Sequence, residues 1–151
     1  MGTPLVFGAP PANGQYITRP GAYAIFFNKK GELGLVKVDT GHYFLAGGGI
    51  EPGEDQETAL LREVQEEAGL QAKVIRRLGQ AAEHYLDREQ NLYYKKIGHF
   101  YLVDILGPAP EGATEEDHTL LWMPAEEAMP LLYHDMYRWA VKQALQSAQR
   151  G

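Results

Sequence analysis

The sequence has no cysteine in its 151 residues, which excludes disulfide bonds and thiolate metal sites. Any bound metal must therefore take oxygen or histidine ligands. The sequence also lacks an apolar run long enough to span a bilayer. Its first residues do not show the basic and then apolar pattern of a signal peptide. We therefore expect a cytoplasmic protein with no membrane partner.

Basic residues are too few for a protein that binds a nucleic-acid polymer. The 14 lysine and arginine residues are outnumbered by 20 aspartate and glutamate residues, and the formal net charge is −6. Binding to a phosphate backbone requires a basic surface. A phosphorylated small molecule is compatible with this charge, provided that a metal ion neutralises its phosphates.

The composition is otherwise that of one folded domain. Apolar residues make up 44% of the chain and aromatic residues 11%, which are ordinary values for a globular protein. Residues 1–15 contain three prolines and three glycines, and we expect an irregular N-terminal arm there. Residues 16–151 are expected to form a single domain that buries its own core.

Strands and helices are expected to form a mixed α/β domain, with the sheets covered by helices. Runs of aromatic and β-branched residues predict strands, the first of which starts after Pro20. Apolar residues at helical spacing predict a helix that begins near Asp55 or Gln56 and ends at Gly69. The other predicted elements are a strand at 33–38, a hairpin of 72–86 and 92–106, a loop at 107–117, a strand at 120–123, and helices from Pro124 and over 133–149.

Three carboxylates, Glu63, Glu66 and Glu67, lie at relative positions 0, +3 and +4 of the predicted helix. Side chains at this spacing share one face of a helix, so all three point at the same volume. They would repel one another without a cation, and Mg²⁺ is a hard cation that takes oxygen ligands. The glycine run at 47–49 would let the backbone approach a bulky ligand closely. The pattern therefore predicts a metal site.

The same glutamates belong to a longer pattern. It consists of Gly48, five residues, Glu54, seven residues and then the run REVQEEAGL at 62–70. This pattern resembles the complete box of the Nudix hydrolase family. The resemblance implies a Nudix α/β/α sandwich with a mixed sheet, in which the box forms a loop, a helix and a second loop. It also implies hydrolysis of a pyrophosphate bond in a nucleoside diphosphate derivative, with Mg²⁺ or Mn²⁺ as the cofactor.

The resemblance assigns roles to individual residues. The three glutamates Glu63, Glu66 and Glu67 would be the catalytic and metal-binding set. The backbone carbonyl of Gly47 would be a further metal ligand. The remaining pair, Glu54 and Arg62, would form a structural ion pair that fixes the helix relative to the loop before it.

One more carboxylate, from outside the box, is expected to join the metal site, and Glu116 in the acidic loop is our choice. Glu115 and Asp117 flank it, and Glu83 and Asp87 in the hairpin are the competing candidates. A polar surface loop is an equally good interpretation of this acidic run. The five histidines show no spacing typical of metal ligands, and we interpret them as structural or surface residues.

The predicted partner is a small molecule of the nucleotide type. An oxidised deoxynucleoside triphosphate is the first candidate, and nucleotide sugars, ADP-ribose and dinucleoside polyphosphates stay open. A different class of function is a catalytically silent Nudix-fold module that binds nucleotides or regulates another protein. Such a module is usually expected to have a degraded box, whereas this one is intact. The chain is expected to be a monomer or a homodimer.

Overall fold

The computed structural model describes residues 5–149, so the first four residues of the predicted arm and the last two of the predicted domain lie outside the described residues. Within this range the strands form two sheets, with the orders β1-β6-β7-β2-β5 and β4-β3-β8. The strands are β1 Val6–Phe7, β2 Ile17–Ile25, β3 Leu33–Val38, β4 Tyr43–Phe44, β5 Ala46–Gly49, β6 Leu70–Asp87, β7 Leu92–Pro108 and β8 His118–Met123. The helices are α1 Gln56–Ala68, α2 Ala125–Ala128, the short 3₁₀ helix η1 Met129–Leu131, and α3 Asp135–Gln149.

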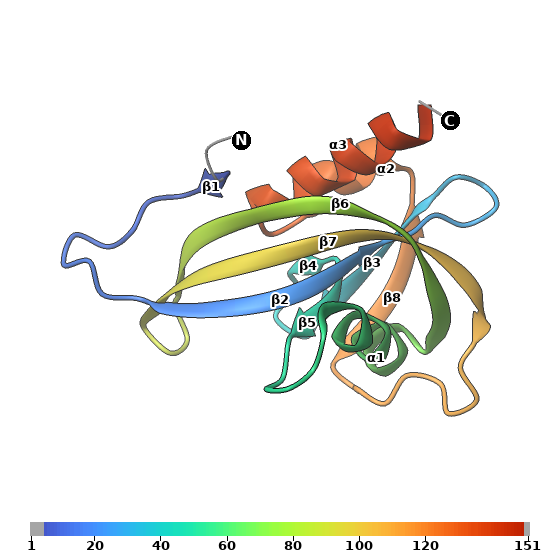
Figure 1. Cartoon of the computed structure of the whole chain (residues 1–151), viewed down its shortest axis with the longest axis horizontal. Helices are drawn as coiled ribbons and strands as arrows, with labels where there is room; N and C mark the ends of the chain where they lie inside the picture. Colours follow the sequence, from blue (N-terminus) through green and yellow to red (C-terminus); the bar gives the residue numbers. More distant parts are fainter. Residues whose placement is uncertain (1–4, 150–151) are drawn as a thin grey trace.

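The five-stranded sheet is mixed, as predicted. Strand β1 runs parallel to β6, and β2 runs parallel to β7. The pairs β2–β5 and β6–β7 are antiparallel. The long β6–β7 hairpin confirms the hairpin predicted from the sequence. Its register shifts three times between Gln71 and Gly79. Bulges of this kind increase the local twist, and the hairpin curves strongly across the molecule (Figure 1).

Helices α1 and α3 cover opposite faces of this sheet (Figure 1). Successive residues of a strand point to opposite faces, and β2 follows this rule. Ala22 and Ala24 pack with α1, whereas Tyr23 and Ile25 pack with α3. All four are buried, so both faces of the strand lie in apolar cores. The predicted α/β/α sandwich is confirmed. No helix within residues 5–149 is both long and apolar enough to cross a membrane.

Two segments differ from the sequence prediction. Strand β2 begins at Ile17, three residues before Pro20, because its pairing with β7 already starts there. Proline is tolerated at this position, because the pairing of β2 with β5 starts only at Gly21, one residue further along β2. Within the segment predicted to be irregular, Val6 and Phe7 form β1 beside β6. The edge of β6 offers unpaired backbone groups to this short strand.

Candidate active site

Helix α1 begins and ends where the sequence predicts. The Asp55 side chain accepts a hydrogen bond from the Thr58 N–H at 2.7 Å and so caps the first turn. Gly69 adopts the left-handed conformation with φ 68°, and its N–H donates to the Gln65 carbonyl. These caps fix the register of the helix and therefore the direction in which each glutamate points.

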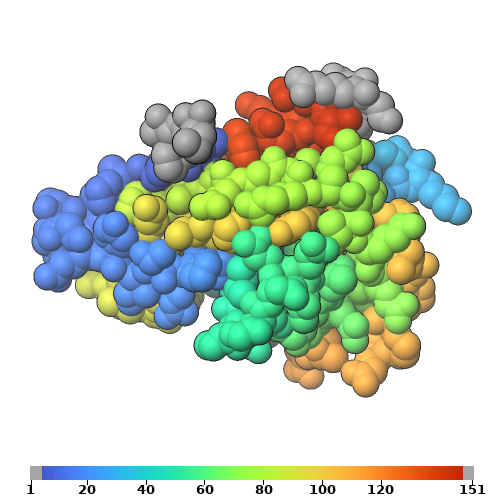
Figure 2. Space-filling view, viewed as in Figure 1, coloured from blue at the N-terminus to red at the C-terminus, as the bar shows by residue number. Residues whose placement is uncertain are grey.

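The helix lies close to the sheet because the residues between them are small or well packed. Its buried side chains Leu60 and Val64 contact the α1 side of the core, which includes Ala22 and Ala24 of β2. The loop that leads into the helix, coloured teal in Figure 2, protrudes from the surface on the side away from α3. The helix is thus anchored on one side and presents charge on the other.

Glu67 is the most buried carboxylate of the predicted set, with 7% of its surface exposed. Its Oε1 accepts a hydrogen bond of 3.0 Å from the Gly47 N–H in β5. Burial raises the pKa of Glu67 to about 8, and the nearby Glu63 and Glu115 carboxylates add to the rise, while the Gly47 N–H opposes it. A carboxylate in this position is fixed in direction and is a stronger base than an exposed one.

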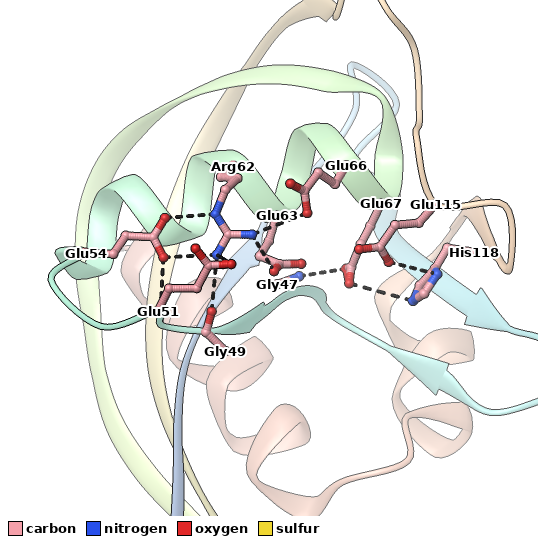
Figure 3. Close-up of polar contacts among 10 residues, drawn as sticks. All are labelled: Gly47, Gly49, Glu51, Glu54, Arg62, Glu63, Glu66, Glu67, Glu115 and His118. Atoms are coloured by element: carbon pink, nitrogen blue, oxygen red, sulfur yellow. Dashed lines mark hydrogen bonds and ion pairs between the residues drawn. The ribbon is translucent and has the colours of Figure 1, made fainter.

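Arg62 connects the helix to the loop before it (Figure 3). Its guanidinium donates to both oxygens of Glu54, at 2.8 and 3.0 Å, which is the bidentate geometry that arginine favours. The same group donates to Glu63 at 2.9 Å, to Glu66 at 3.3 Å and to the Gly49 carbonyl at 3.3 Å. The hydrogen bonds that Glu54 accepts from Arg62 and from the Glu51 N–H lower its pKa to about 2. Arg62 therefore holds three carboxylates and one carbonyl in a fixed arrangement.

Two groups of potential metal ligands lie beside this network. One consists of Glu63, Glu66 and Glu115, and the other of Glu67, Glu115 and His118, each with its ligand atoms within 4.8 Å of one another. Glu115 belongs to both. The loop after β7 places it there, because the N–H groups of Thr114 and Glu115 donate to the Glu66 carbonyl. The last carbonyls of a helix lack partners within it, so the end of α1 is a natural attachment point for this loop.

The carboxylate predicted from this loop was Glu116, which lies in neither group and is exposed. Three acids follow one another here, and the sequence carries no signal that decides which one turns toward α1. His118 is a second residue that the sequence reasoning missed. Its Nδ1 lies 3.2 Å from Glu115 Oε2, and its Nε2 lies 3.8 Å from Glu67 Oε2 (Figure 3).

The chemistry of these ligand atoms fits a hard divalent cation. The carboxylates supply the oxygen ligands that Mg²⁺ and Mn²⁺ take, and the chain has no cysteine thiolate. Burial also raises the pKa of Glu63, and the neighbouring Glu66 and Glu115 contribute to that rise. A cation would relieve this repulsion. The contact of Gly47 with the cluster is made by its N–H, so the carbonyl of Gly47 as a metal ligand stays a prediction.

Two of these carboxylates, Glu63 and Glu67, line a cavity of about 690 Å³. Its walls include the glycine run at 47–49, Glu63, Glu67 and His118, together with aromatic residues of several strands and α3. A second cavity of about 590 Å³ shares part of its lining with the first, including Phe44, Tyr85 and Lys96. Cavities of roughly 300–1,000 Å³ lined by aromatic side chains and a few polar groups are typical of small-molecule sites.

A chain of three polar residues lies beside both cavities. Glu83 Oε2 accepts a hydrogen bond of 2.9 Å from His134 Nδ1, and His134 Nε2 lies 3.2 Å from Lys96 Nζ. The other oxygen of Glu83 accepts the Met136 N–H at 2.8 Å, in the first turn of α3. Burial lowers the pKa of His134 to about 4, against the opposing effect of Glu83. The imidazole is therefore neutral at pH 7.

The neutral state of His134 predicts that its contribution to stability decreases in acid. The unfolded chain binds a proton at this histidine near pH 6.5, but the folded chain only near pH 4. The contribution of His134 to the free energy of unfolding should therefore fall as pH falls through that window, by about 2 kcal/mol between pH 7 and pH 5. Other groups titrate in the same range, so the effect is the difference between wild type and His134→Gln in urea unfolding at several pH values. The same pH dependence in both proteins would contradict a neutral His134.

Comparisons with known proteins agree with this geometry. A family model described as NUDIX domain matches residues 17–144. A curated Bacillus subtilis (strain 168) protein named "Putative 8-oxo-dGTP diphosphatase" is 35% identical over 78 residues, which are 51% of this chain and 52% of that protein. The chain thus spans about half the length of this relative.

Solved structures share the fold. A NUDIX hydrolase from Nitrosomonas europaea matches with a TM-score of 0.67 and 15% identity, over 86% of this chain and 90% of that one. The MutT protein from Methanosarcina mazei Go1 matches with a TM-score of 0.66 and 20% identity, over 88% of this chain and 97% of that one. At these identities the likeness concerns the fold alone.

Proposed function

Because the chain belongs to the Nudix hydrolase family, we propose that it is a metal-dependent pyrophosphohydrolase that cleaves a phosphoric anhydride of a nucleotide. The observation that carries this proposal is the position of Glu67. It is a buried carboxylate of raised pKa, it is oriented by the Gly47 N–H, and it lies among further carboxylates at the wall of a cavity of nucleotide size. An acidic patch that served only solubility would be exposed to solvent.

The residues proposed to hold divalent cations are Glu63, Glu66 and Glu67 of α1, with Glu115 in place of Glu116. When bound, such cations act as Lewis acids on phosphoryl oxygens and lower the pKa of water. Glu67 Oε1 is occupied by the Gly47 N–H, which leaves Oε2 to accept a proton from the attacking water. Bound cations would favour the ionised form of Glu67, and its burial keeps it a stronger base than an exposed carboxylate.

The substrate proposed first is an oxidised deoxynucleoside triphosphate. The name of the Bacillus subtilis relative supports this choice, and so does a cavity with both carboxylates and aromatic rings in its walls. The carboxylates, through bound cations, would face the phosphates. The rings would face the base, because aromatic side chains stack on planar groups.

A substrate panel with product analysis tests the proposal. Purified protein with Mg²⁺ or Mn²⁺ is incubated with normal and oxidised nucleoside triphosphates, a nucleotide sugar, ADP-ribose and a dinucleoside polyphosphate. We expect metal-dependent release of a monophosphate product, fastest from an oxidised triphosphate. Binding of a nucleotide that survives incubation with metal would overturn the proposal and identify a module that does not catalyse. Faster cleavage of another class would replace the proposed substrate.

A further inference from the structure

Lys96 of β7 occupies an unusual position for a lysine. Its Nζ lies 5.4–5.8 Å from the centres of four aromatic rings, in Tyr23, Phe44, Tyr85 and Tyr137. A cation at this distance is attracted to each ring face. Burial lowers its pKa to about 8, so it still carries a proton at pH 7. A charge in such surroundings is costly unless it is hydrogen-bonded.

The structure supplies one of those hydrogen bonds through an ordered chain. The Glu83 carboxylate accepts from Nδ1 of His134, which requires the hydrogen to be on Nδ1. The Nε2 of the neutral imidazole is then an acceptor, and Lys96 Nζ donates to it at 3.2 Å. Glu83 thus sets the tautomer of His134, and His134 sets the direction of one N–H of Lys96.

Two donors of the ammonium remain for a ligand. Among residues 5–149, His134 is the hydrogen-bond partner that the structure gives to Lys96 Nζ, and an ammonium has three N–H groups. Lys96 is only partly buried and lines both cavities. Polar groups enclosed by aromatic rings normally have partners, so the two remaining donors of Lys96 indicate an acceptor-bearing ligand.

The aromatic surroundings of Lys96 indicate which part of a nucleotide it would meet. The backbone of Lys96 pairs with Arg19 of β2, and Gly47, which binds Glu67, pairs with Tyr23, four residues further along β2. The lysine side chain extends from its own level toward Tyr23, whose ring centre lies 5.6 Å from Nζ. The ammonium thus lies among rings on which a planar base can stack.

We propose that Lys96 is a specificity-determining residue that donates a hydrogen bond to a carbonyl oxygen of the substrate base, with His134 and Glu83 as positioning residues. The inference rests on the proposed function in taking the ligand to be a nucleotide. Guanine-type purines, oxidised or not, carry a carbonyl acceptor at C6, where adenine carries an amino donor. An ammonium accepts no hydrogen bond, so the adenine amino group finds no partner at Lys96. The site therefore selects carbonyl-bearing bases.

Inosine and adenosine nucleotides provide a matched pair of probes, because their bases differ at this position of the ring. Binding of the two monophosphates with Mg²⁺ is measured by titration calorimetry, which requires no turnover. We expect wild type to bind the inosine nucleotide about tenfold more tightly. In Lys96→Met this preference should fall to near one, through weaker binding of the inosine nucleotide. Lys95→Met is the control, since Lys95 points to the other face of β7 and lines neither cavity.

The outcomes separate the inference from the proposed function. A preference that depends on Lys96 in a protein that cleaves no nucleotide would support the inference and refute the activity. Equal binding of the two nucleotides by wild type would overturn the inference, even if the protein were an active hydrolase. An equal loss of affinity for both in Lys96→Met would also overturn it, because Lys96 would then contact the phosphate.

The positioning roles are tested at His134. Glutamine can donate to Glu83 and accept from Lys96, whereas leucine can do neither. We expect His134→Gln to keep most of the base preference and His134→Leu to lose it, with circular dichroism confirming that each variant is folded. For the triphosphates, the loss should appear in KM, with kcat changed much less. Equal base preference in the two variants would overturn the positioning role.

Discussion

Replacing Glu67 by glutamine is expected to lower kcat/KM by about 100-fold or more while the fold is kept. Glutamine has the shape of glutamate, and its carbonyl oxygen can still accept the Gly47 N–H. What it loses is the negative charge for a cation and the basicity for a proton. Activity assays on Glu67→Gln and Glu57→Gln measure this effect. Glu57 is the matched control, because it is an exposed carboxylate in the first turn of the same helix.

The stability of Glu67→Gln should move in the opposite direction from its activity. The pKa of Glu67 is about 8 in the folded chain and about 4.3 in an unfolded one, so its burial increasingly destabilises the metal-free fold as pH rises through that window. Glutamine removes this cost. With a chelator at pH 7, the Tm of the variant should equal or exceed that of wild type. Added Mg²⁺ should raise the Tm of wild type by more than it raises the Tm of Glu67→Gln. Full activity in Glu67→Gln would contradict the catalytic role proposed for Glu67.

Replacing Gly47 by alanine is expected to destabilise the protein by about 2–4 kcal/mol and to remove most activity. Gly47 has φ 149°, and a Cβ there would lie 2.2 Å from the Ala22 carbonyl oxygen and 2.7 Å from Tyr23 Cα. Both are backbone atoms of β2 that cannot turn aside. Strand β5 would have to move, and the N–H that orients Glu67 would move with it. Thermal unfolding should show a Tm lower by roughly 5–15 °C.

Gly49→Ala is the matched control for this change. Gly49 lies two residues further along β5, and a Cβ there would meet no atom within 4 Å. Its carbonyl, which accepts from Arg62, is kept in alanine. We expect this variant to stay within about 0.5 kcal/mol of wild type. Similar Tm values for the two alanine variants would show that the crowding at Gly47 has no energetic consequence.

The features of the site that sequence could predict depend on neighbours along the chain. Helix α1 has a capping aspartate, an apolar face and a terminal glycine, all within one short segment, and its predicted ends agree with the structure. The spacing of Glu63 and Glu67 by one helical turn follows from the same periodicity. The predicted strand at 33–38 is likewise local: Leu33 and Leu35 alternate with Val36 along β3, and the structure buries them in the two cores on its opposite faces.

The features that sequence could not predict depend on contacts between distant segments. Glu115 approaches α1 because its loop docks on the Glu66 carbonyl, and that docking has no local signature. His134 lies 51 residues from Glu83 and 38 from Lys96. A single histidine or lysine in a strand or loop is by default structural or exposed, and only the folded arrangement brings these three into one hydrogen-bonded chain.

Glu83 has a consequence for the dynamics of the C-terminal helix. One of its oxygens orders the chain that ends at Lys96, and the other holds the first turn of α3 through the Met136 N–H. The same carboxylate therefore stabilises the first turn of α3 and orients Lys96 through His134. A ligand that binds only when Lys96 is oriented in this way therefore raises the free energy required to unfold the start of α3 locally. Hydrogen exchange at the start of α3 would then report on which base occupies the cavity.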